Sequence, residues 1–85
     1  MADLPSREQL VEVLTAAGAA HDDYERAALK GMVDDRWSGF YAAYVLGRIG
    51  EFTAASRLAA LLAEVDAGED WSATAANHVL MKLRS

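Results

Sequence analysis

The side chains that could carry acid–base chemistry in this sequence are few, and histidine is the best suited of them. There are two histidines, His21 and His78. Histidine exchanges protons near neutral pH, and a catalytic role needs a carboxylate or a hydroxyl within reach. Tyr24 and Glu25 follow His21 at helical spacing, so that histidine is the candidate for such a role. We expect both histidines to be structural, because each falls on an apolar helix face.

Acidic pairs are the next group that could do chemistry, since carboxylates bind divalent cations. They occur at Asp22-Asp23, Asp34-Asp35 and Glu69-Asp70, without the alternating donors and central glycine of a calcium loop. Two of the pairs precede expected helices, where the helix dipole stabilises them. Cysteine is absent, and no phosphate loop or nucleophile motif occurs. The sequence therefore predicts no metal site, no cofactor and no enzyme.

Aromatic residues form the most unusual pattern in the chain. Trp37, Phe40, Tyr41 and Tyr44 recur at the spacing of one helix face. Such a stripe either packs the core or lies open as a groove, where aromatic side chains dominate binding energy. We favour the core, and keep the groove as the functional alternative. The candidate ligand- or partner-binding residues are Tyr24, Trp37, Tyr41, Tyr44 and His78.

A long first helix is expected over residues 6–29. Ser6 is its predicted N-cap, and Gln9 three residues later completes a capping box. The apolar stripe keeps its phase through Gly18, so we favour one helix. Two short helices that meet at Gly18 are the alternative.

Three further helices are expected, each with apolar positions at helical spacing and with a recognisable start or stop. Glycines at positions 39 and 47 would let a neighbouring helix approach closely. The expected boundary residues are Asp34 or Asp35 and Gly50 for the second helix, Thr53 (with Phe52 as a staple) and Gly68 for the third, and Asp70 for the start of the fourth.

Composition supports the same fold class. Alanine and leucine dominate, proline occurs once, and no strand-like alternation is present. With 85 residues the chain has room for a single core. We predict one all-α domain over residues 1–85, a compact bundle of four to five helices.

An internal repeat links the second and fourth helices. Residues 35–46 and 69–80 align at an offset of 34 residues, with tryptophan, serine, alanine, valine and leucine in register. Repeats of this period are typical of stacked helical hairpins. We therefore expect Trp37 and Trp71 to occupy equivalent, largely buried places, each against the helix that precedes it.

A family resemblance accompanies the repeat. Residues 42–55 read Ala-Ala-Tyr-Val-Leu-Gly-Arg-Ile-Gly-Glu-Phe-Thr-Ala-Ala and, with the leucine-rich helix that follows and residues 75–80, resemble the short HEAT-like repeats of bacterial α-solenoids. The resemblance covers residues 37–84 and implies two echoing helical hairpins. Ser38-Gly39 stands where those repeats usually have Val-Arg, and Met81-Lys82 where they have Gly-Arg. The aromatic motif from Trp37 to Tyr44 also looks like one found in small bacterial helical proteins, which implies no activity.

Charge and hydropathy restrict the partners. The formal net charge of −5 leaves no basic face for DNA, RNA or anionic lipid. The sequence shows no signal peptide and no membrane-spanning stretch, so we expect a cytoplasmic protein. We predict a non-catalytic protein–protein interaction module whose partner is another protein or a second copy. Binding of a small apolar ligand in an aromatic groove between helices is the alternative.

Self-association is the first testable prediction. A domain of this size without disulfides often shares an apolar face, and the alanine-rich helix around residues 54–63 offers one. We expect a homodimer at micromolar concentration. Sedimentation equilibrium measures the mass directly, and a monomer mass across that range contradicts the prediction.

Overall fold

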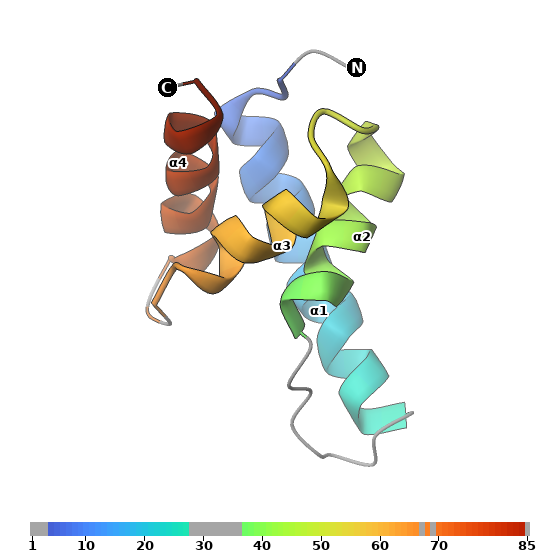
Figure 1. Ribbon diagram of the computed structural model, residues 1–85. Coiled ribbons are helices and arrows are strands. Elements are labelled where there is room, and N and C mark those ends of the chain that lie inside the picture. Colours follow the sequence, from blue (N-terminus) through green and yellow to red (C-terminus); the bar gives the residue numbers. More distant parts are fainter. Residues whose placement is uncertain (1–3, 28–36, 67, 69, 85) are drawn as a thin grey trace.

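A computed structural model of the chain describes residues 4–27, 37–66, 68 and 70–84. These residues form four α-helices: α1 (Arg7–Ala27), α2 (Trp37–Ile49), α3 (Ala55–Ala63) and α4 (Trp71–Arg84). No strand occurs within the described ranges. The predicted all-α bundle is thereby confirmed (Figure 1).

Helix α1 has a neighbour on each side. Both α2 and α4 pack against it and run back in the opposite direction, while the short α3 packs on α2 and α4 (Figure 1). Contacts along α1 give the direction of α4, since Arg7 bonds Asn77 and Thr15 bonds Ser72. The helices that carry the repeat, α2 and α4, therefore begin at the same end of the bundle.

The core consists of apolar side chains from all four helices and from Phe52, which is only 2% exposed. On α1 the buried positions Leu10, Val13, Leu14, Ala17 and His21 fall at helical spacing, whereas Tyr24, the next position in phase, is 40% exposed. Leucines of α3 cover the centre, and small alanines of α4 let that helix approach closely. The buried core residues are Leu10, Val13, Leu14, Ala17, Ala42, Val45, Phe52, Leu58, Leu61, Leu62, Ala75, Ala76, Val79 and Leu80.

The start of α1 is capped as its sequence predicts. The backbone N–H of Gln9 donates to Ser6 Oγ, and the backbone N–H of Ser6 donates to Gln9 Oε1, both over 3.1 Å. Helix α1 continues without a break through Gly18. The expected end at residue 29, like the expected cap at Asp34 or Asp35, lies outside the described residues.

The remaining boundaries are partly as predicted. Gly50 follows α2 with φ of 108°, a conformation that glycine adopts readily. The N-cap of α3 is Ala54 and not Thr53, without a side-chain cap bond. Helix α3 ends at Ala63, well before Gly68; the N–H groups of Glu64 and Val65 donate to the carbonyl oxygens of Leu61 and Leu62, three residues back, and so close its last turn. Asp70 directly precedes α4 as predicted, and its carbonyl oxygen accepts from the N–H of Thr74.

The expectation that Gly39 and Gly47 admit a close helix was wrong. Both are exposed, and a Cβ there would meet nothing within 4 Å. The close approach occurs at Gly18, where a Cβ would lie 3.3 Å from the hydroxyl of Tyr41.

The two indoles are partly buried and pack against the core. They contact each other where α2 and α4 begin.

The capping box provides a stability prediction with an internal control. Ser6→Ala removes one capping bond and leaves an amide of the first turn without its side-chain acceptor, which typically costs about 1 kcal/mol. Thr53→Ala should leave the stability nearly unchanged, since Thr53 makes no cap bond. Urea denaturation of both variants measures the difference. If both variants lose the same free energy of unfolding, the capping box does not stabilise α1.

Candidate functional site

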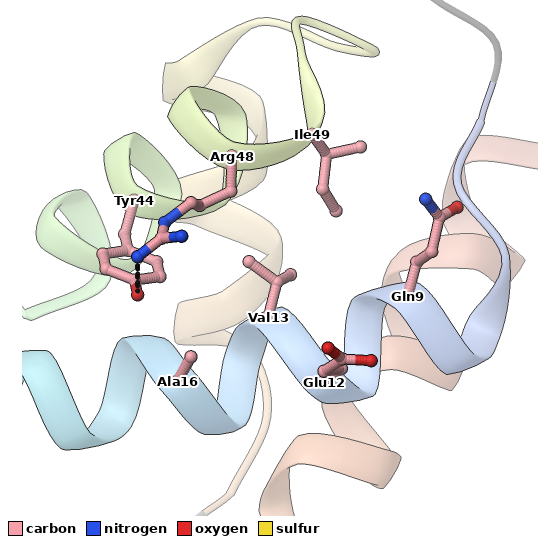
Figure 2. A pocket seen from close by; sticks show the side chains of 7 residues that line it. All are labelled: Gln9, Glu12, Val13, Ala16, Tyr44, Arg48 and Ile49. Carbon is pink, nitrogen blue, oxygen red and sulfur yellow. Dashed lines mark hydrogen bonds between the residues drawn. The ribbon is translucent and has the colours of Figure 1, made fainter.

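A groove lies between α1 and α2. Its volume is about 430 Å³. Figure 2 shows the α1 and α2 side chains that face each other across it. Its lining residues are Gln9, Glu12, Val13, Ala16, Tyr44, Arg48 and Ile49.

The groove has an apolar floor and polar rims. Val13 projects from α1 and Ile49 from the end of α2 into the space between the helices, while Gln9 and Glu12 lie on the α1 side (Figure 2). On the α2 side, Arg48 donates to the hydroxyl of Tyr44 over 3.0 Å, and its guanidinium lies 5.1 Å from the centre of that ring. These contacts hold the arginine in place, and a guanidinium has further N–H donors for a ligand.

A second feature is a cluster of six rings contributed by α1, α2 and α4. We call it the aromatic cluster; its members are His21, Tyr24, Trp37, Phe40, Tyr41 and Trp71. Tyr41 lies at its centre, in contact with four of the other five rings at centroid distances between 5.4 and 6.5 Å. At one edge Tyr24 stacks on Phe40 and is 40% exposed.

Part of the aromatic cluster borders a pocket of about 280 Å³, which we call the indole pocket. It is lined by Trp37, Tyr41, Val65 and Trp71. The three rings stand nearly perpendicular to one another, with interplanar angles of 88°, 74° and 77°. The indole N–H of Trp71 donates to the carbonyl oxygen of Val65 over 3.4 Å, which fixes the orientation of that ring.

The electrostatics of the cluster are set by acids of α1. Burial raises the pKa of the Tyr41 hydroxyl above its ordinary value of 10.0, and the charges of Glu25 and Asp22 raise it further. His21 is 7% exposed, and its Nδ1 lies 3.8 Å from Glu25 Oε1. Asp22 and Asp23 also pair with Arg26, each over 2.9 Å, so part of the acidic charge at this end of α1 is compensated.

The structure divides the five predicted site residues among three places. Tyr24, Trp37 and Tyr41 meet in the aromatic cluster, but Tyr44 faces the α1–α2 groove. His78 lies outside both hollows, and its Nε2 is 2.8 Å from Glu64 Oε1.

The two histidines have different ring and ion-pair neighbours, so the arrangement does not bring them together as an acid–base pair. His21 lies among the rings of the cluster, whereas His78 pairs with the carboxylate of Glu64.

The sequence-based set lacked most of the groove lining and several residues of the aromatic cluster and indole pocket; Trp71 and Arg48 are the two of these that matter most for the candidate sites. Trp71 lines the indole pocket and Arg48 forms a rim of the groove. The repeat signalled Trp71, because it places this tryptophan in register with Trp37. Arg48 was signalled only by its position four residues after Tyr44, a spacing at which helical side chains meet.

Within the described ranges, no group of three or more His, Asp or Glu side chains could hold a metal ion, and no helix has the length and apolar character needed to cross a membrane. Comparisons with protein-family models, with curated proteins and with solved structures gave no match.

The raised pKa of Tyr41 gives a prediction for alkaline pH. A group whose pKa is higher in the folded state contributes its full stability below the unfolded value, about 10, and loses it as the pH rises through the folded value. The melting temperature of the wild type should therefore fall above about pH 10 more steeply than that of Tyr41→Phe, which has no hydroxyl to ionise. If the melting temperatures of the two proteins fall in parallel as the pH rises, Tyr41 has the same pKa in the folded and the unfolded state.

Proposed function

We propose that this protein is a non-catalytic protein-interaction module that binds its partner in the α1–α2 groove. The observation that carries the proposal is Arg48, held against Tyr44 beside an apolar floor. Arginine and tyrosine are among the residues that contribute most to binding energy at protein interfaces. An arginine whose position is already fixed loses less side-chain entropy on binding.

The occupant we propose is an amphipathic helix that carries a carboxylate. Its apolar face would cover Val13 and Ile49, and its acidic residue would accept hydrogen bonds from the guanidinium of Arg48. Glu12 on the opposite rim favours a basic residue on the other flank of that helix. The opposite charges of the two rims would fix the direction in which the helix lies.

The rest of the proposal concerns partners and location. The net charge of −5 supports a protein partner over nucleic acid or anionic membrane, and we expect the protein to act in the cytoplasm. Alanines 55, 60 and 63 are exposed on α3, which supports self-association through that face. The resemblance to HEAT-like hairpins stays a prediction. The two helices that carry the repeat, α2 and α4, begin at the same end of the bundle, but their backbones do not pack along each other as equivalent helices of stacked hairpins do.

A second candidate function is the binding of a small ligand. It is favoured by the indole pocket, in which three rings and Val65 border about 280 Å³. This volume lies just below the range of pockets that hold drug-sized molecules, which begins at about 300 Å³. A compact ligand therefore suits this pocket better than a peptide does.

A display library of helical peptides, selected against the immobilised protein, tests the groove. We expect selected peptides to combine an apolar stripe with an acidic residue, and to shift NMR signals of residues 9–16 and 44–49. Arg48→Ala should weaken their binding about 30-fold, the size expected for an interface hot spot.

Arg57→Ala is the matched control, because Arg57 is an exposed arginine on α3 that does not line the groove. It should leave the peptide affinity unchanged. If both substitutions weaken peptide binding equally, Arg48 acts only through its positive charge and not through a specific contact. If the selected peptides shift the NMR signals of other residues instead, the groove is not the interface.

A further inference from the structure

The indole pocket combines aromatic walls with carboxylates nearby. None of its four lining residues is charged. Glu25 and Asp22 lie close enough to act on Tyr41, and Asp22 also pairs with Arg26 over 2.9 Å. Asp66 and Asp70 are exposed and follow or precede the lining residues Val65 and Trp71 directly in the chain.

The geometry of the rings suits one class of ligand. Three planes that meet at 74° to 88° form a corner. Aromatic faces carry the negative part of the ring quadrupole and attract cations, tryptophan most strongly. Groups of such rings recognise quaternary ammonium ions, whose methyl groups also bury apolar area. A neutral apolar ligand would gain free energy from the burial of apolar area, but it would gain none from attraction to the carboxylates.

We propose that the indole pocket binds a small organic cation with a trialkylammonium head group. This inference rests on the second candidate function, ligand binding, and is independent of the α1–α2 groove. The head group contacts the rings of Trp37, Tyr41 and Trp71. The carboxylates of α1 and of the segment between α3 and α4 attract the cation without contacting it directly.

Choline and its neutral isostere 3,3-dimethyl-1-butanol separate charge from shape. Both carry a group of three methyls on a tetrahedral centre, and only choline is charged. The chain has two tryptophans, and both line the pocket. Their two indole N–H signals in a proton–nitrogen NMR spectrum therefore report binding at this site. We expect choline to shift both signals and to bind about tenfold more tightly than the isostere, with an affinity that falls as salt is added.

Conservative variants test the contribution of the rings. Trp71→Phe keeps an apolar ring but weakens the attraction for a cation, so choline affinity should fall while the affinity for the isostere changes little. Met81→Leu is the matched control, because Met81 is an exposed apolar residue of the same helix, α4, and lines neither the groove nor the indole pocket. It should leave the choline affinity unchanged. Circular dichroism melts verify that both variants remain folded.

The outcomes separate the proposals. Equal affinities for choline and the isostere would overturn the cation proposal and leave the pocket as an apolar ligand site. No shift of either indole signal with both compounds would overturn ligand binding altogether. Cosedimentation with phosphatidylcholine vesicles distinguishes a lipid-borne head group, if the protein pellets, from a soluble cation, if only free choline binds.

Discussion

The continuity of α1 through Gly18 is the constraint on which both candidate sites depend. Residues 9–16 of this helix form one wall of the groove, and His21 and Tyr24, beyond the glycine, contribute to the aromatic cluster. A break at Gly18 would turn these two segments independently of each other. Glycine within a helix costs about 1 kcal/mol relative to alanine. Here it also leaves the space that the Tyr41 hydroxyl occupies, 3.3 Å from where a Cβ would lie.

The fold was largely predictable because its signals are local. Apolar spacing identified the buried face of α1, and the Ser6–Gln9 pair identified its start. The predictions were wrong at positions where the structure depends on tertiary packing. A threonine preceded α3 in the sequence, yet the cap fell one residue later, on Ala54. Gly39 and Gly47 lie on the exposed side of α2, and helical period alone does not specify which side that is.

The candidate sites were less predictable, because their residues converge from separate helices. The aromatic stripe of α2 was read as one surface. Seven residues of helix rise by about 10 Å, so Trp37 and Tyr44 face different neighbours. Trp37 meets Trp71 of α4, and Tyr44 meets the first half of α1. A periodicity identifies a face, whereas the neighbouring helices decide which part of it forms a pocket.

Tyr41 connects the architecture to the chemistry of the aromatic cluster. Its hydroxyl lies over Gly18, its ring contacts both tryptophans, and the acids of α1 act on its ionisation. Burial and negative charge keep the hydroxyl neutral, which avoids a buried phenolate next to Glu25. The same negative charge that opposes ionisation of Tyr41 favours a cation at the rings beside it. Burial is the larger cause of the raised pKa of Tyr41, and the carboxylates of Glu25 and Asp22 add to it; these two carboxylates are the part of the environment that would also select a cationic ligand.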